Sequence, residues 1–296
     1  MKRLTVLTLS LLLALSLSAC KKAEEAPQTP VPAAPTDAET PQEGFTTLTG
    51  DAFAPTNLKS VSADAVVTEG RIPEGEYDLP EEVTRQRDLV TSGGIALLAE
   101  IPEKDIAFYG LEGKEFYPAL IRWGTSQAEF DWLYMTPRCI EPRLWCFDFD
   151  GDGVDELVVD CYWGSGTGVS LRDLHVVEKN ADGTLTAYTF PADVLMQTLG
   201  GYTCLVKAGN DDYAVLGGEM VHITELPGGE TLDLKKHDLT AGSVLGFEKT
   251  EQGMECSVGI QLEGGELHFW YVADVTADVF YKDGTFILDG FHLDGY

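Results

Sequence analysis

Short apolar segments separated by turn residues dominate the pattern of the chain from residue 116 onward. In many of them apolar and polar residues alternate, which is typical of strands with one buried face. The pattern predicts strands at residues 116–123, 144–149, 157–163, 174–179, 185–190, 213–216, 220–225, 254–262, 266–273, 279–281 and 285–288.

Glycine and aspartate fill several connections between these segments. The composition of hairpin loops is found at residues 180–183, 227–229, 263–265 and 282–284. Since hairpins join antiparallel neighbours, we expect an all-β fold of mainly antiparallel sheets, arranged as a sandwich or as an incomplete propeller. One or two short helices are expected, at 79–89 and at 192–199, where Gly200 and Gly201 follow the second segment.

The N-terminal residues have the layout of an export signal. Lys2 and Arg3 precede an apolar run at 4–17, which is shorter than the roughly 20 residues of a membrane-spanning helix. The following Leu-Ser-Ala-Cys resembles the lipobox of bacterial lipoproteins. The resemblance implies that residues 1–19 are a signal peptide and that Cys20 carries a lipid; an ordinary cleaved signal with a chance cysteine is the alternative. We therefore expect an extracytoplasmic protein tethered to the membrane, at the cell surface or on the periplasmic face.

Residues 20–60 form a segment of different composition, rich in proline, alanine and glutamate. Such a sequence buries too little apolar surface to offset its ordering entropy, so we expect a disordered tether after the lipidated cysteine. Residues 61–296 are then a single β-rich domain, close to the upper size for one hydrophobic core.

The charge of the chain narrows the classes of partner. There are 49 acidic and 20 basic side chains, with a formal net charge of −29. Repulsion from phosphate argues against nucleic acid as a partner. A well-hydrated surface is the simplest interpretation of this balance, whereas metal binding needs a specific cluster of ligands.

The remaining cysteines carry little chemistry of their own. No two of them have zinc-type spacing; they are Cys139, Cys146, Cys161, Cys204 and Cys256. Bridges between Cys139 and Cys146 or between Cys161 and Cys204 are conceivable in an exported chain, and buried free thiols are the alternative.

One acidic loop, at 148–156, carries specific chemistry. Its carboxylates alternate with other residues, and two glycines allow the chain to curl. This is the donor pattern that a hard, oxygen-seeking ion such as calcium requires. The loop is not an EF-hand, because its twelfth position is Val159 and its flanks resemble strands. The expected ligands are the side chains of Asp148, Asp150, Asp152 and Glu156 and the carbonyl of Val154.

The same loop resembles the calcium loop of FG-GAP and VCBS repeats, whose pattern is D-x-D-G-D-G-x-x-D/E-L between two strands. The resemblance implies the same five ligands, an outward-pointing Asp155, and a connection inside a propeller-like blade. Segments 130–133, 136–138, 164–170 and 174–176 add a likeness to exported VCBS-repeat-containing lipoproteins. The loop occurs once, which favours a single decorated sheet or sandwich over a complete calcium propeller. A structural calcium ion is expected, and an empty tight turn is the alternative.

The rest of the sequence gives weaker functional signals. Aromatic residues near the loop, Trp132, Tyr134 and Trp163, are candidates for a platform that stacks on sugar rings, with core packing as the alternative. The glycine-rich stretch at 164–168 lacks the lysine of a phosphate-binding loop. We expect a non-enzymatic binding or adhesion module for an unidentified glycan or protein. The alternative is a cell-envelope hydrolase for glycans or peptides that uses acids such as Asp131, Asp160 and Glu178.

Overall fold

The computed structural model describes residues 58, 60–73, 75–81, 94–111, 118–134, 140–224, 226, 232–264 and 267–296. The chain divides into two compact units, and all of these residues belong to the second, Glu43–Tyr296. The expected signal peptide, Cys20, Cys139, nearly all of the tether and most of the expected helix at 79–89 lie outside the described residues. Within the described part, no helix has the length and apolar character needed to cross a membrane.

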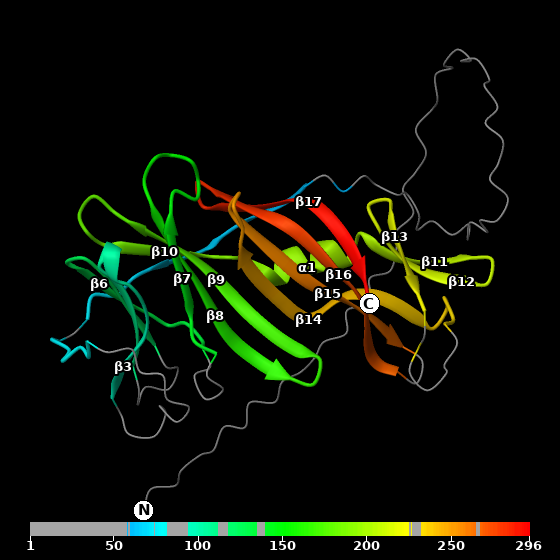
Figure 1. Cartoon of the computed structure of the whole chain (residues 1–296), viewed down its shortest axis with the longest axis horizontal. Helices are drawn as coiled ribbons and strands as arrows, with labels where there is room; N and C mark the ends of the chain where they lie inside the picture. Colours follow the sequence, from blue (N-terminus) through cyan, green and yellow to red (C-terminus); the bar gives the residue numbers. More distant parts are fainter. Residues whose placement is uncertain are drawn as a thin grey trace, which may run out of the picture. The chain divides into compact units, whose positions relative to one another are not determined.

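The largest sheet has ten strands, which run in the order β1-β17-β16-β15-β14-β9-β10-β2, while β7 and β8 extend it from β9. Its strands are β1 (Ser60–Asp64), β2 (Val66–Glu69), β7 (Arg143–Phe147), β8 (Glu156–Gly166), β9 (Val169–Lys179), β10 (Leu185–Thr189), β14 (His237–Lys249), β15 (Met254–Gly264), β16 (Leu267–Lys282) and β17 (Thr285–Gly295). Neighbours pair antiparallel, apart from β9 and β14, which meet in parallel. Figure 1 shows the β8–β9 hairpin in green beside the orange and red strands of this sheet.

Two smaller antiparallel sheets complete the described β structure. The four-stranded sheet contains β3 (Ile95–Ile101), β4 (Ile106–Leu111), β5 (Ala119–Trp123) and β6 (Ser126–Phe130), in that order. The three-stranded sheet contains β11 (Thr203–Ala208), β12 (Asp211–Leu216) and β13 (Glu219–Ile223). A single α-helix, α1 (Ala192–Gly200), and the 3-10 turn η2 (Pro102–Lys104) are the described helical segments. The all-β prediction and the helix at 192–199 are therefore confirmed.

Most expected strands coincide with observed ones, and two differences are informative. The segments 266–273 and 279–281 are parts of one strand, β16, so the prediction of two strands there is wrong. The turns at 180–183 and 282–284 connect β9 to β10 and β16 to β17, as expected of hairpins. The sequence pattern did not predict β1, β2, β3, β4, β6, β11 and β14.

Strand β8 has its central residues buried on both faces. Leu157 and Val159 belong to a hydrophobic core that they share with the four-stranded sheet. Val158, between them, belongs to a second core with residues of α1 and β14–β17. Both cores draw on alternate residues of one strand, which explains why this segment is an almost unbroken apolar run. The four-stranded sheet thus packs against this part of the large sheet in the manner of a sandwich.

The described cysteines are free thiols. Cys161 and Cys256 are buried, and Cys146 and Cys204 are half-buried. The bridge considered between Cys161 and Cys204 is therefore absent, while Cys139 lies outside the described residues. Burial raises the pKa of Cys256 to about 12 and that of Cys146 to about 11. Such thiols are largely protonated at neutral pH and are poor nucleophiles.

Candidate functional site

The acidic loop is the connection of the β7–β8 hairpin. Gly151 and Gly153 have φ angles of 80° and 90°, in the left-handed region that glycine adopts without strain. The curl brings backbone N–H groups onto the first carboxylate of the loop. Asp148 accepts from the N–H of Gly151 at 2.8 Å and from that of Gly153 at 3.1 Å.

Three of the expected ligands come together in space. Asp148, Asp150 and Glu156 each have a carboxylate oxygen within 4.8 Å of the others. Asp152 is not a member of this group, although the sequence pattern placed it among the ligands. Its side chain instead accepts a hydrogen bond from the backbone N–H of Val154 at 2.7 Å. Asp150 accepts a bond of the same kind from the backbone N–H of Asp152 at 3.0 Å, so this local bond does not by itself explain why Asp152 lies outside the group.

Glu156 is the buried member of the group, with 4% of its surface exposed. Burial raises the pKa of its carboxyl group to about 7, and the charge of Asp150 also raises it. The backbone N–H of Phe149 donates to this carboxylate at 2.7 Å and opposes the shift. The donor set consists of oxygen atoms, so it fits a hard cation such as calcium rather than zinc or copper.

Asp155 lies outside the carboxylate group and forms an ion pair with Lys104 of η2. Its side chain is 44% exposed, in agreement with the outward orientation implied by the FG-GAP resemblance. The ion pair joins the loop to a segment 51 residues earlier in the chain. The loop is thereby attached to the end of β3, which η2 directly follows.

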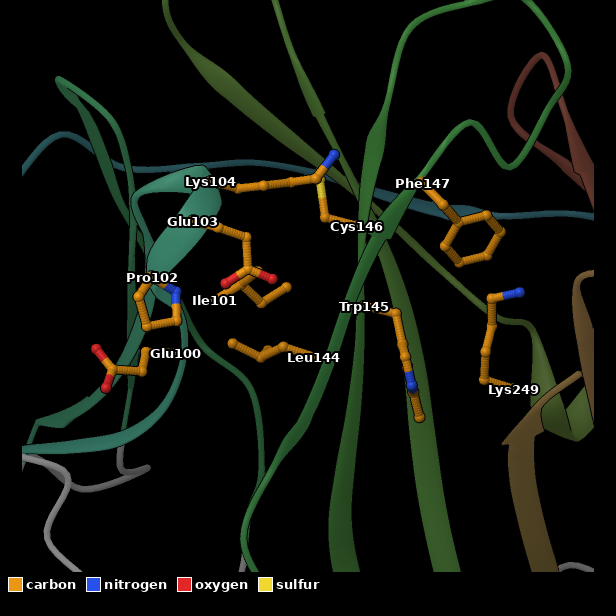
Figure 2. A pocket seen from close by; sticks show the side chains of 10 residues that line it. All are labelled: Glu100, Ile101, Pro102, Glu103, Lys104, Leu144, Trp145, Cys146, Phe147 and Lys249. Carbon is orange, nitrogen blue, oxygen red and sulfur yellow. The ribbon is translucent and has the colours of Figure 1, made fainter.

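A hollow of about 320 Å³ adjoins the loop, between β7 and the end of β3 with η2. Figure 2 shows the side chains of Ile101, Glu103 and Leu144 directed into the same space. The lining consists of Glu100, Ile101, Pro102, Glu103, Lys104, Leu144, Trp145, Cys146, Phe147 and Lys249. The sequence pattern gave no sign of this hollow, because its walls come from segments that are far apart in the chain.

The two lysines of the hollow are already engaged. Lys104 pairs with Asp155, and the ammonium group of Lys249 lies 4.2 Å from the centre of the Phe147 ring. Lys249 also donates to the carbonyl oxygen of Thr250 at 2.7 Å. Asp155 balances the charge of Lys104, whereas Lys249 keeps its positive charge, so the two glutamates Glu100 and Glu103 leave the hollow with a small net negative charge.

The candidate platform residues are placed differently from one another. Trp132 is 5% exposed and stacks on the rings of His175, at 4.1 Å between centroids, and of Phe130, at 4.5 Å. It belongs to the core and offers no open ring to a sugar, so the platform interpretation is wrong for this residue. Tyr134 and Trp163 are half-buried.

Tyr134 also takes part in core packing, with its ring edge-on to that of Phe108 at 5.5 Å. Asp173, close to Trp163, is half-buried, and burial raises the pKa of its carboxyl group to about 6. Neither aromatic ring lines the hollow beside the loop.

The acids considered for a hydrolase each have a partner of opposite charge or a hydroxyl donor. Asp131 forms a two-pronged ion pair with Arg71, with one contact at 2.7 Å. Glu178 accepts a hydrogen bond from the hydroxyl of Tyr281 at 2.6 Å.

Asp160 is completely buried and accepts from Arg143 Nε at 2.7 Å and Arg172 Nη1 at 2.8 Å. Burial raises the pKa of its carboxyl group, and the two guanidinium groups oppose that shift. The arrangement resembles a structural ion network more than a pair of carboxylates poised for acid–base work.

Comparison of the chain with models of known protein families, with curated proteins and with solved structures found no match in any of the three. The resemblance to FG-GAP and VCBS repeats therefore rests on the loop and its flanking segments, and it stays a prediction.

Proposed function

We propose that the chain is a calcium-binding β domain, lipid-anchored outside the cytoplasm, that acts as a non-enzymatic binding or adhesion module. The export signal at 1–19 and the lipidation of Cys20 are supported by the sequence pattern. The calcium site is supported above all by one observation, the gathering of Asp148, Asp150 and Glu156 at the β7–β8 connection.

Calcium in this position has a structural role. The loop ends at Glu156, the first residue of β8, and the next residues of β8 supply both adjoining hydrophobic cores. Carboxylates held this close repel one another, and a divalent cation removes that repulsion. Extracellular calcium sites are commonly weak, with dissociation constants on the order of 0.1–1 mM.

Thermal unfolding of the full chain, with calcium and with a chelator, tests the site. At about ten times the dissociation constant, binding to the folded state adds roughly 1.4 kcal/mol. For a domain of this size we expect the melting temperature to rise by about 3–5 °C. The variant Asp150→Asn should lose most of this rise because it removes one of the three gathered charges.

A matched control is Asp182→Asn in the β9–β10 hairpin. Asp182 also caps a glycine-containing turn, accepting the backbone N–H of Thr184 at 2.9 Å, but it does not belong to the carboxylate group. This variant should keep the full response to calcium. Equal melting temperatures of the unmodified chain in calcium and in chelator would contradict the proposed site.

A further inference from the structure

The hollow beside the calcium loop runs along an unpaired strand edge. β7 pairs with β8 on one side, and no other described strand pairs with it. β3, which contacts β7 across the hollow, is likewise an edge strand that pairs with β4. An unpaired edge presents backbone N–H and C=O groups in a row, and an added strand satisfies them.

The net charge of the hollow is negative. Glu100 and Glu103 are exposed, and their carboxylates form no hydrogen bond or ion pair with other described residues. Asp155 balances the charge of Lys104, and Lys249, which lies over the Phe147 ring, offsets only one of the two glutamates. The net charge of −29 acts in the same direction, since it attracts basic partners and repels acidic ones.

The walls near these carboxylates are apolar. Ile101 and Leu144 face the space that the Glu103 carboxylate enters in Figure 2. An apolar wall ending in a carboxylate matches a lysine or arginine side chain, which has an aliphatic stem and a charged tip. A sugar fits less well, because the guanidinium group of Arg143 already lies over the Trp145 ring, 5.3 Å from its centre.

We propose that this hollow binds an extended basic peptide segment, which pairs with the free edge of β7 and places a lysine or arginine side chain beside Glu103 and Glu100. The inference rests on the proposed function, because it names the partner class of that binding module. The acidic loop connects the two walls of the site. Phe147 of β7 directly precedes Asp148, and Asp155 forms the ion pair with Lys104 of η2.

The test uses the full chain and a labelled seven-residue peptide of alternating lysine and valine, titrated by fluorescence anisotropy at physiological salt. The matched peptide has the same residues with N-methyl groups on alternate amides, so its charge is unchanged but one edge cannot pair. We expect the N-methylated peptide to bind at least roughly tenfold more weakly, because several backbone hydrogen bonds are lost. A peptide with glutamate in place of lysine should not bind.

Variants of the protein test whether the peptide binds in this hollow. The double variant Glu100→Gln and Glu103→Gln keeps the shape of both side chains, and we expect it to weaken binding of the lysine peptide about fivefold or more. The control Glu69→Gln removes an exposed carboxylate from β2, which is separated from β7 by β8, β9 and β10 in the sheet. This variant should leave binding unchanged. Hydrogen exchange at the β7 amides should slow when the peptide binds.

Three outcomes would overturn the proposal. Equal binding of the two basic peptides would mean attraction by overall charge alone. Unchanged binding by the double variant would place the site elsewhere. Binding of a neutral oligosaccharide that the double variant loses, without binding of the peptide, would assign the hollow to a glycan. Calcium-dependent melting is measured on the same samples, so a failure of the calcium proposal is seen separately from a failure of peptide pairing.

Discussion

Asp160 shows how the protein accommodates a charge in its interior. Its carboxylate is completely buried and is held by the guanidinium groups of Arg143 and Arg172. Removing one partner of such a network leaves uncompensated buried charge, so we expect Asp160→Asn to lower the free energy of unfolding by about 3–5 kcal/mol. Urea unfolding of the variant and the unmodified chain measures this difference.

The exposed pair of Asp131 and Arg71 provides the control for that prediction. Both side chains are more than half exposed, at 61% and 51%. Solvent screens such a pair, and Asp131→Asn should cost less than about 1 kcal/mol. Similar losses for Asp131→Asn and Asp160→Asn would show that burial does not set the cost.

His175 gives the fold a dependence on pH. Its ring is 2% exposed, stacks on Trp132 and shares a hydrogen bond of 2.8 Å with the hydroxyl of Thr189. Burial lowers the pKa of this histidine from 6.5 to about 3. The unfolded chain therefore binds a proton below pH 6.5 that the folded protein does not bind, and the stability from the neutral ring is complete above pH 6.5 and is lost as the pH falls toward 3.

We expect a His175→Gln variant to reveal this loss. Between pH 7.5 and pH 5 the difference in unfolding free energy between the unmodified chain and the variant should shrink by about 2 kcal/mol, at roughly 1.4 kcal/mol per pH unit below 6.5. Urea unfolding at each pH gives the difference, in which contributions from other groups cancel. An NMR titration in which the His175 ring becomes protonated near pH 6.5 would refute the burial argument.

At the scale of elements, glycines in two hairpin turns allow the cost of a left-handed backbone to be distinguished from the cost of a steric clash. Gly168, between β8 and β9, and Gly209, between β11 and β12, have φ angles of 69° and 64°. A Cβ atom at Gly209 meets nothing within 4 Å, whereas one at Gly168 lies 2.2 Å from the Phe269 ring. Gly209→Ala should therefore cost about 1 kcal/mol from the left-handed backbone alone, and Gly168→Ala about 1–2 kcal/mol more.

A double-mutant cycle checks the origin of the extra cost. Phe269 is 38% exposed, so its truncation to alanine is tolerable on its own. In the Phe269→Ala background, Gly168→Ala should become as mild as Gly209→Ala, as measured by urea unfolding. An excess cost that persists without the ring would mean that the turn itself, rather than the contact, is responsible.

The elements that the sequence predicted are those with a strong local pattern. The strands around the acidic loop have apolar runs bounded by turn residues, and their positions agree closely with β7, β8 and β9. β3 was missed because its short apolar run, Ile-Ala-Leu-Leu-Ala-Glu-Ile, fits a buried helix as well as a buried strand. β16 was divided in two because Asp274 and Asp278 interrupt its apolar pattern. Their strand is continuous because long-range pairing with β15 and β17 overrides local preference.

The candidate site, like the strands, could be predicted from the sequence only where its signal lies within one short segment. The acidic loop is contiguous, so its ligand pattern could be found in the sequence, although Asp152 lies outside the group that gathers in space. The hollow could not be found, because Glu103, Leu144 and Lys249 meet only through tertiary packing. A site assembled from distant segments leaves no periodic signal in any one of them.

At the scale of the whole molecule, the excess of negative charge is concentrated by strand register. Glu248, Glu255, Asp278 and Asp289 lie directly opposite one another on four neighbouring strands, β14 to β17. Like charges at opposing positions of a sheet destabilise it. Arg143 neutralises one end of this row, through a contact of 2.6 Å with Glu248, while the overall charge of −29 adds a general repulsion.

We therefore expect the stability of this protein to rise with ionic strength. Asp278 lies inside the row, with a carboxylate on either side, so Asp278→Asn should stabilise the fold by about 0.5–1 kcal/mol at low salt. In 1 M sodium chloride the Debye length falls to about 3 Å, and the advantage of the variant should nearly disappear. Urea unfolding in a chelator at both salt concentrations isolates this effect from calcium binding. A variant that is less stable at low salt would mean that Asp278 makes a favourable interaction that outweighs the repulsion along the row.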